Sequence, residues 1–324
     1  MNSQLLEKTK LIAVFFLLII GLILAVSPVY AAEEIIKLLP HWKKGEKIHF
    51  EKVKSRQRMQ EDKVTLKSTN RTDLGIEVLS VSDRNYVLAF TYGEARFDDP
   101  TQAENPIVKK ITNLFKGYQI ILELDSNAKI LGVQNWKELK EMSTKLLDTL
   151  SGEMKSAGLD QATVSRICTQ VASMYATKQQ IDQFYTQEAQ LLFFALGVEF
   201  KNDKPFQFED SLPSPLGGEP IPSRASFTLK EVDKNIGVAK VMFTQTIDSE
   251  NAKRVVNKAL KDLSQNISKP APDSEMIKSL TIEDSAEFNF EISSGWVQFL
   301  KHRRFYRIDN ASQEDIITIT RKKD

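Results

Sequence analysis

Between Gly45 and Phe97, apolar and polar residues alternate with a period of two. Successive side chains of a β-strand point to opposite faces of its sheet, so this alternation is typical of strands that bury one face. Polar turns interrupt the pattern, most plainly at residues 82–85, Ser-Asp-Arg-Asn. The sequence therefore predicts an antiparallel β-meander over residues 45–97.

The pattern changes to helical spacing in the segment that follows. Asn105 is a typical N-cap, Pro106 suits the first helical position, and Gly117 is a typical helix stop. Between these signals one face of the expected helix is apolar: Ile107, Val108, Ile111, Leu114 and Phe115. We predict a short amphipathic helix that docks on the sheet.

The next segment predicts a hairpin followed by a helix. Apolar residues alternate over 118–124, and residues 125–127, Asp-Ser-Asn, have the composition of a tight turn. A return strand over 129–134 would complete the hairpin. Asn135, followed three residues later by Glu138, is a variant of the capping box, so a helix is expected to start there.

A second helical stretch is expected over residues 160–196, with a break near Lys178. It becomes apolar on almost every side at residues 191–197, which is typical of a buried helix. Cys168 is the single cysteine, so no internal disulfide can form. Because it recurs with apolar residues at helical spacing, we interpret it as a packing residue on a buried helix face.

The densest Pro/Gly segment follows, with four prolines and two glycines among residues 210–223. This composition argues against a helix or a central strand. We therefore place a linker or surface loop over residues 198–222. It would join an N-terminal lobe of meander, hairpin and helices, residues 33–197, to a C-terminal α+β lobe, residues 223–324.

The C-terminal lobe repeats the order of strands and a helix. Apolar residues from Ala252 to Leu263 recur at helical spacing. Strands are expected before and after this helix, over residues 225–233, 237–247, 279–292, 295–308 and 314–323. Runs of strands and runs of helices, without β-α-β alternation, predict an α+β fold. We expect twisted antiparallel β-sheets with helices packed on one side, in an arrangement that allows two similar lobes.

The first 31 residues have the order of a secretory signal peptide. Lys8 and Lys10 precede an apolar run over residues 11–26, and small residues follow at Ala31 and Ala32. This run of about 16 residues is shorter than the ~20 that a membrane-spanning helix needs. We therefore expect cleavage after residue 31, no stable transmembrane anchor afterwards, and an exported protein that is periplasmic or secreted. An uncleaved membrane anchor is the alternative.

Charge and motifs narrow the function classes. Removal of residues 1–31 leaves 42 basic and 42 acidic residues, a balance that argues against a nucleic-acid partner. No G-x-S-x-G, H-E-x-x-H, C-x-x-C or G-x-x-x-x-G-K motif occurs. The three histidines, His41, His49 and His302, are too scattered to suggest a zinc site. We expect no catalytic residue, no metal and no cofactor.

Basic and aromatic residues interleave over 296–308, the one strand with candidate binding chemistry. Its candidate contacts for an anionic ligand are Lys301, Arg303 and Arg307. The structural alternative is a face of solvated bases over a buried aromatic face. With strict alternation, neither face of this strand would be purely apolar. The structural alternative therefore predicts a bulge or bend near 301–303, which would return apolar residues to one face. We predict the bend; a regular strand with Arg303 and Arg307 in a cavity would instead form an anionic-ligand site.

Three segments resemble exported bacterial β-rich proteins known as domains of unknown function: residues 214–252, residues 122–139 and the closing strands. The expected arrangement, an exported β-sheet with helices, is also loosely similar to LolA/LppX-like envelope carriers, which hold lipid on a curved antiparallel sheet. This chain is longer than those carriers and lacks the lipidated cysteine that many of them have. The shared motifs are turns, caps and a Pro/Gly loop, so the resemblance implies no functional residue.

These features lead us to expect a non-enzymatic exported protein that binds a hydrophobic or amphipathic envelope molecule between sheet and helices. Its partner would be a lipid or amphipathic small molecule. One alternative is an assembly protein whose exposed strands and Pro/Gly loop engage another envelope protein. A second alternative is a hydrolase whose acidic residues converge from distant strands, as in glycosidases.

Overall fold

The computed structural model describes residues 35–173, 175–201, 204–212, 219–266 and 277–323. The predicted signal peptide and residues 213–218 of the Pro/Gly segment lie outside the described residues. The chain divides into two compact units, Met1–Ile35 and Ile36–Asp324. Of the first unit only Ile35 is described, and the fold below is that of the second unit.

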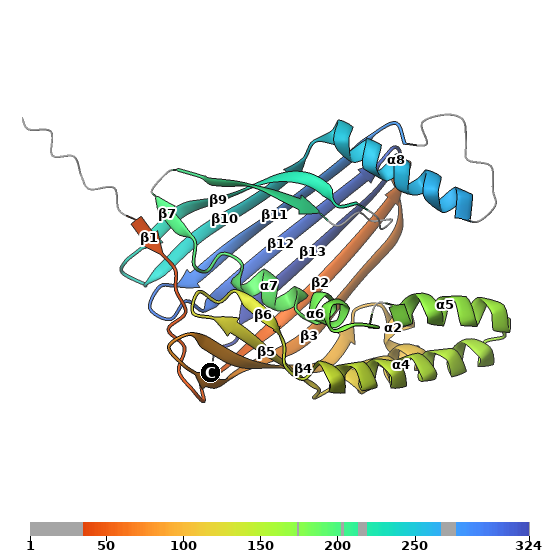
Figure 1. The fold of residues 1–324 in the computed structure, drawn as a ribbon, viewed down its shortest axis with the longest axis horizontal. Coiled ribbons are helices and arrows are strands. Elements are labelled where there is room, and N and C mark those ends of the chain that lie inside the picture. Colours follow the sequence, from red (N-terminus) through yellow and green to blue (C-terminus); the bar gives the residue numbers. More distant parts are fainter. Residues whose placement is uncertain (1–34, 174, 202–203, 213–218, 267–276, 324) are drawn as a thin grey trace, which may run out of the picture. The chain divides into compact units, whose positions relative to one another are not determined.

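Eleven strands of the described chain form one antiparallel sheet (Figure 1). Their order across the sheet is β6-β5-β4-β3-β2-β13-β12-β11-β10-β9-β8. Their bounds are β2 Lys47–Gln60, β3 Lys63–Val81, β4 Asn85–Phe97, β5 Gln119–Asp125, β6 Ile130–Val133, β8 Phe206–Leu212, β9 Ile221–Asp233, β10 Val238–Ile247, β11 Leu280–Glu291, β12 Val297–Ile308 and β13 Ala311–Arg321. Two further strands are short: β1 Ile35–Lys37 and β7 Glu199–Lys201.

The predicted meander, the hairpin and the C-terminal strands are confirmed. Strands β2 to β5 pair with their neighbours in chain order, as a meander does. In the β5–β6 hairpin the Asp125 carboxylate accepts hydrogen bonds from the backbone N–H groups of Asn127 at 2.8 Å and Lys129 at 2.9 Å. The structure is therefore a β-rich α+β fold built on a large antiparallel sheet.

One pairing joins strands that are far apart in the sequence. Strand β13 pairs antiparallel with β2 in a continuous register, from Ala311 opposite Gln60 to Arg321 opposite Phe50. Both predicted lobes consequently contribute strands to a single sheet. Within the predicted linker 198–222, strands β7 and β8 and the start of β9 are present. The division into two lobes stays a prediction.

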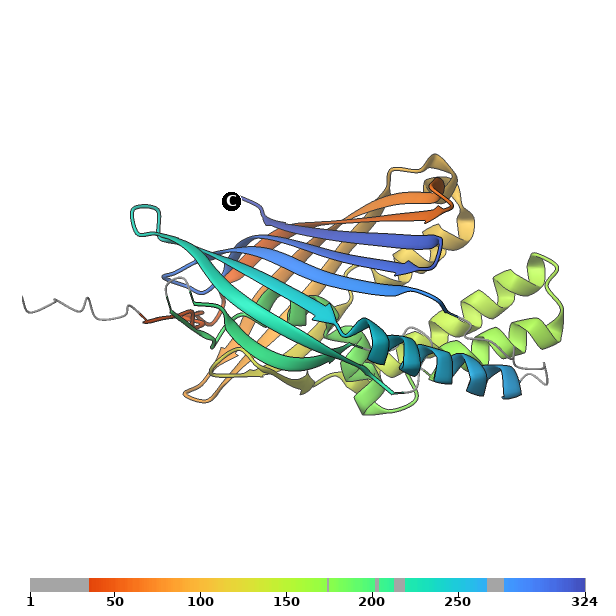
Figure 2. The same cartoon turned by 90° about the horizontal axis from the view of Figure 1, so that it is seen from above.

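The helices of the described residues follow the predicted order. They are α2 Pro100–Glu104, α3 Pro106–Phe115, α4 Trp136–Ser156, α5 Gln161–Ser173, α6 Lys178–Tyr185, α7 Gln187–Phe193 and α8 Ser249–Asn266. Figures 1 and 2 show α4 and α8 on the same side of β12 and β13. None of these helices combines the length and hydropathy of a membrane span in the part of the chain that is described.

Both predicted helix starts are confirmed, at Asn105 before α3 and at Asn135 before α4, but only one has the predicted side-chain cap. The Asn105 side chain caps α3 as predicted, because its oxygen accepts from the backbone N–H of Ile107 at 2.9 Å. The predicted capping box at Asn135 is wrong, since this side chain makes no cap hydrogen bond to α4. Its oxygen accepts instead from the Ile121 N–H at 3.0 Å and its amide donates to the Gln119 carbonyl at 2.8 Å. Asn135 thus ties the start of α4 to strand β5.

The main core lies between the sheet and the segment that begins with α7. The predicted buried run is confirmed, because Leu192, Phe193 and Ala195 are no more than 2% exposed. Phe193 contacts Trp42, which stacks on Trp296 with ring centroids 4.4 Å apart. We call the side of the sheet that carries these contacts the inner face. Other buried members of the same cluster are Phe50, Leu74, Phe90, Phe288 and Leu300.

Strand β12 does not bend where a bend was predicted. Residues 299–308 keep a regular register with β11 and with β13, and the register shift lies opposite Asn289 and Phe290 instead. The prediction of a bend at 301–303 is therefore wrong. The strand stays regular because the polar residues on its covered face are paired: His302 and Arg304 both contact the buried carboxylate of Asp284.

Candidate functional site

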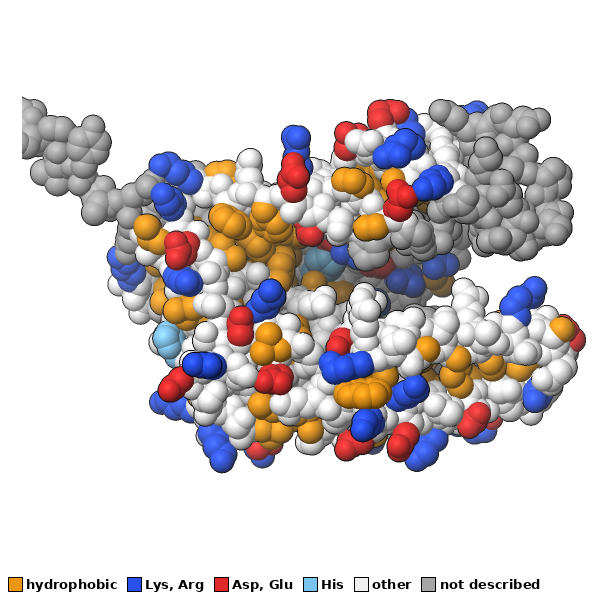
Figure 3. Space-filling model, in the orientation of Figure 1, with side chains coloured by type: hydrophobic (Ala, Val, Ile, Leu, Met, Phe, Trp, Pro, Cys, Tyr) orange, Lys and Arg blue, Asp and Glu red, His pale blue; other side chains and the backbone are white. Residues whose placement is uncertain are grey.

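A cavity of about 430 Å³ lies between the sheet and several helices. Strands β2 to β5 supply one wall, and α3, α4, α6, α7 and Tyr118 supply the other. The lining residues are Lys52, Lys54, Thr72, Tyr92, Gly93, Ala95, Thr112, Tyr118, Ile120, Leu139, Met142, Phe184, Tyr185, Gln187 and Glu188. Sites for small ligands have volumes of about 300–1,000 Å³, so this cavity is of ligand size. Figure 3 shows the molecule hollowed between α8 and the α4–α5 pair, with Lys and Arg side chains in the hollow.

The helical wall of the cavity is apolar and aromatic. Leu139 and Met142 lie on the buried stripe of α4, and Phe184 and Tyr185 come from the end of α6. The Tyr185 hydroxyl forms a 2.9 Å hydrogen bond with Ser143, and burial raises its pKa to about 12. Its hydroxyl is therefore neutral. The charged residue of this wall among the lining residues is Glu188 of α7.

Strand β2 carries a row of basic residues, of which Lys52 and Lys54 line the cavity. Lys52, Lys54 and Arg56 alternate along β2 and therefore point to the same face, the face that also carries buried Phe50. The change along β2 from apolar to basic residues at position 52 marks the change from the packed core to the cavity.

The first base of the row has an acidic partner. Lys52 donates to the Glu188 carboxylate at 2.7 Å, and the Tyr92 hydroxyl donates to the other oxygen at 3.2 Å. Burial alone would raise the pKa of the Glu188 carboxyl, but Lys52 and these hydrogen bonds outweigh it and hold the pKa below its ordinary value. Glu188 is thus an anion that neutralises Lys52.

The third base of the row also has an acidic partner. Arg56 forms a two-pronged ion pair with Asp315, with Nε–Oδ1 at 2.6 Å and Nη2–Oδ2 at 2.9 Å. The register places Asp284, Arg304, Asp315 and Arg56 directly opposite one another on β11, β12, β13 and β2. Negative and positive side chains therefore alternate across four strands, which is the arrangement that stabilises cross-strand pairs.

The middle base, Lys54, lies outside this pattern. Its direct cross-strand neighbours are Ile317 on β13 and Asn70 on β3, neither of which is acidic. Among the residues that the structure describes, its ammonium makes no hydrogen bond and no ion pair. Burial, and after it the charge of Arg56, lower the pKa of Lys54.

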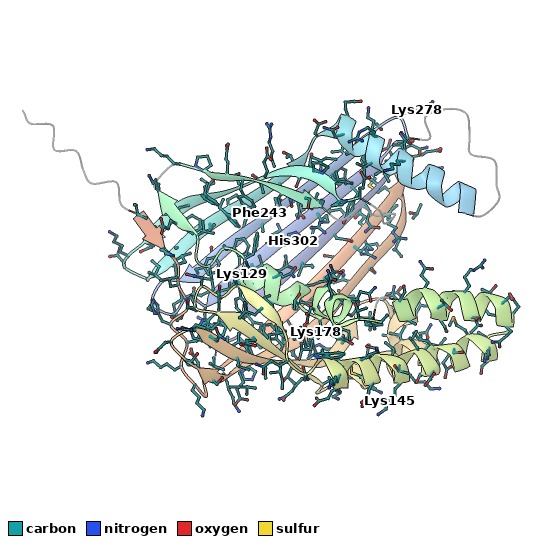
Figure 4. The ribbon with its side chains drawn as sticks, viewed as in Figure 1. Lys129, Lys145, Lys178, Phe243, Lys278 and His302 are labelled. Atoms are coloured by element: carbon teal, nitrogen blue, oxygen red, sulfur yellow. The ribbon has the colours of Figure 1, made fainter. Side chains whose placement is uncertain are left out.

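A second polar cluster lies at the centre of the sheet, near His302 (Figure 4). Asp284 is 3% exposed and His302 is 7% exposed, and Arg304 donates to the same carboxylate from Nε at 2.7 Å. His302 Nδ1 has no hydrogen-bond partner among the described residues. Because Arg304 neutralises Asp284, this acid is not the free carboxylate that acid–base chemistry needs.

The three sequence-predicted contacts lie on the other face of β12. Lys301, Arg303 and Arg307 alternate with the inner-face residues His302 and Arg304. Arg303 forms ion pairs with Glu314 at 2.6 Å and Glu283 at 3.4 Å. The guanidinium groups of Arg303 and Arg307 both lie over the Phe305 ring, at 5.3 and 5.5 Å from its centroid. The structure thus brings Arg303 and Arg307 together, but it places neither of them nor Lys301 in the cavity wall.

The sequence prediction missed the basic row of β2. One signal was available: Lys52-x-Lys54-x-Arg56 continues the period of Ile48 and Phe50, which are both buried. Three bases on the continuation of a buried face predict either acidic partners or a polar site.

No protein-family model and no curated protein matches this chain. Among solved structures it is similar to lipovitellin, in a structure that describes lipid–protein interactions, with 10% identity and a TM-score of 0.42. That match covers 87% of this chain and 26% of lipovitellin, so the chain spans about a quarter of it. A second similar structure is a Bacteroides fragilis protein described as exported and as having a YmcC-like fold, with 9% identity and a TM-score of 0.21, over 89% of this chain and 100% of that one. At these scores neither match carries an argument about this protein, and neither shows similarity to LolA/LppX-like carriers.

Proposed function

We propose that this chain is a non-enzymatic exported protein that binds a hydrophobic or amphipathic envelope molecule. The observation that carries the proposal is the cavity between β2–β5 and helices α3, α4, α6 and α7. Its volume is that of a ligand site, and such sites are lined mainly by apolar and aromatic side chains with a few polar groups. This cavity has that composition.

The distribution of polarity in the cavity supports an amphipathic rather than a purely apolar ligand. Met142, Leu139 and Phe184 lie on the helical side, and Lys52 and Lys54 lie on the strand side. A ligand with an apolar body and a polar end would satisfy both sides. The order of the first 31 residues supports export, to the periplasm or out of the cell.

The hydrolase alternative has less support from the site. It requires acidic residues that converge and stay free for proton transfer. Glu188, Asp284 and Asp315 do come from distant segments to the inner face, but each forms an ion pair with a base. These ion pairs occupy the three carboxylates, which favours a structural role.

Native mass spectrometry of the exported protein after gentle extraction tests the proposal. We expect an adduct with the mass of a lipid or other amphiphile, which dissociates on activation. The variant Ala95→Phe would fill part of the cavity and should lose the adduct, while Ala162→Phe, on the exposed side of α5, should keep it. A wild-type protein that emerges without any ligand from several extractions would contradict the proposal.

A second candidate function, assembly with another envelope protein, is favoured by strand β8. This strand is at the end of the strand order, and Phe206 is 48% exposed on it. Open edge strands can pair with a strand of another chain. Crosslinking in cells from position 206 should then give one reproducible protein adduct, which the carrier proposal does not require.

A further inference from the structure

The basic row of β2 has one cation more than it has acidic partners. Lys52 is paired with Glu188 and Arg56 is paired with Asp315. Lys54 stands between them on the same face, and it has no ion pair or hydrogen bond among the described residues. The row therefore presents one uncompensated positive charge to the cavity.

The register of the sheet explains why no acidic residue of the described part of the chain pairs with Lys54. Its cross-strand neighbours, Ile317 and Asn70, are one apolar residue and one neutral amide. The nearest acids, Glu188 and Asp315, are already held by the bases on either side. A charge that is half-buried without a partner is unfavourable, because desolvation is not repaid by a counter-charge.

A polar group on the neighbouring strand, opposite Lys52 and diagonal to Lys54, could contribute to binding. Thr72 on β3 lines the same cavity, is 8% exposed, and its hydroxyl makes no hydrogen bond to any described residue. The hydroxyl and the ammonium are both donors that an oxyanion with two or more oxygens could accept from.

We propose that the molecule bound in the cavity is an anionic amphiphile whose carboxylate or phosphate forms an ion pair with Lys54. Its apolar chain lies against the wall of Leu139, Met142 and Phe184. This inference rests on the proposed function, and it adds the chemical class of the ligand. We assign the ligand a single acidic group because Lys54 is the one base of the row that has no acidic partner among the described residues. A quaternary ammonium headgroup is disfavoured by the same charge.

The lowered pKa of Lys54 agrees with this assignment. Burial and the Arg56 charge, which lower that pKa, both act against the ammonium form, and an anion placed beside it would act in the opposite direction. Binding of an anionic amphiphile should therefore stabilise Lys54 in its charged form.

Three probes have similar oleyl chains and different headgroups: oleate, oleyl phosphate and oleyl alcohol. Comparing their affinities distinguishes the contribution of the headgroup from that of the apolar chain. Their binding to the mature protein is measured by calorimetric titration below the concentration at which each probe aggregates. We expect at least one of the two anions to bind about ten- to a hundredfold more tightly than the alcohol, as a charge-assisted hydrogen bond implies. The anion that binds more tightly identifies the headgroup as a carboxylate or a phosphate.

Lys54→Met should reduce the affinity for the anion to about that of the alcohol and leave the alcohol's affinity unchanged. The matched control is Lys67→Met, which removes an exposed lysine from the neighbouring strand β3. Lys54→Gln, which keeps a polar side chain, should behave like Lys54→Met, and urea unfolding shows whether either variant is folded.

Different results would overturn the acidic headgroup and the proposed function. If the alcohol binds as tightly as both anions, or if Lys54→Met keeps the preference for the anion, the acidic-headgroup inference is overturned and the proposed function stands. If none of the three probes binds, both are overturned.

Discussion

Removal of the negative charge of Glu188 should weaken folding and strengthen anion binding at the same time. Glu188→Gln keeps the shape of the side chain, and its single amide oxygen can still accept from Lys52, as Oε1 does at 2.7 Å. Its NH2 group replaces the oxygen that accepts from Tyr92 at 3.2 Å, so the Tyr92 hydroxyl has to accept there. The substitution removes the charge without removing volume. Lys52 and Lys54 would then both face the cavity without a carboxylate.

The exposure of the pair sets the expected loss of stability. The Lys52 and Glu188 side chains are 13% and 26% exposed, between the buried and the surface case. Breaking a fully buried pair costs about 3–5 kcal/mol, and an exposed pair contributes about 0–1 kcal/mol. We therefore expect a loss of about 2 kcal/mol in the free energy of unfolding at neutral pH.

The gain in binding follows from the spacing along the strand. Residues two positions apart in a strand are about 7 Å apart, so an anion on Lys54 would be about that far from Lys52. At an effective dielectric constant of about 20, the uncompensated Lys52 charge adds about 2 kcal/mol of attraction. Salt with a Debye length of about 8 Å reduces this to about 1 kcal/mol, or roughly fivefold in affinity.

Urea unfolding and titration with oleate or oleyl phosphate measure the two effects on one protein sample. Glu94→Gln is the control, because Glu94 pairs with Lys116 where both side chains are exposed. The pKa of Glu188 is held below its ordinary value of 4.5, so its contribution is complete above that pH and is lost as the pH falls through the folded-state value. The difference between wild type and variant should close in acid. An affinity that falls in parallel with stability, or does not change, would refute this reasoning.

Three further predictions concern the sheet. Asp284→Asn should cost about 3–5 kcal/mol in urea unfolding, because it leaves the Arg304 guanidinium without its buried counter-charge; Arg304→Met added to it should restore part of the loss. Trp296→Ala should cost about 3–5 kcal/mol by the same measurement, since Trp296 is 0% exposed in the main core. The pKa of Asp315 is lowered because its hydrogen bonds and ion pair with Arg56 outweigh burial, which alone would raise it. Wild type should thus lose stability relative to Asp315→Asn as the pH falls below the ordinary value of 3.8, and parallel curves would contradict this assignment.

The strands and helices were predictable because their signals are local. Alternation over β2 to β4 places one set of side chains on each face whatever the partner strand is, and the caps at Asn105 and Pro106 act within one helical turn. The Asn135 side chain shows the limit of such signals. It has the composition of a cap, but tertiary contacts with Ile121 and Gln119 compete for the same atoms.

The same limit of local signals explains why the prediction of a bend in β12 was wrong. The sequence shows that both faces of the strand mix apolar and basic residues, and a bend is one way to keep bases out of the core. A second way is to supply an acid from a neighbouring strand. Asp284, in register opposite Arg304, does so.

The sequence by itself determined the order of most strands and helices, β7 and β8 within the predicted linker being exceptions. Through the period of β2 it also determined that Lys52, Lys54 and Arg56 share one face. Only the tertiary structure decided which of these bases is neutralised. Glu188 is 136 residues from Lys52, and Asp315 is 259 residues from Arg56. Side-chain direction depends on local backbone geometry, whereas charge balance depends on the pairing of β13 with β2 and the packing of α7, which no local pattern encodes. The unpaired charge at Lys54 is therefore a property of the register.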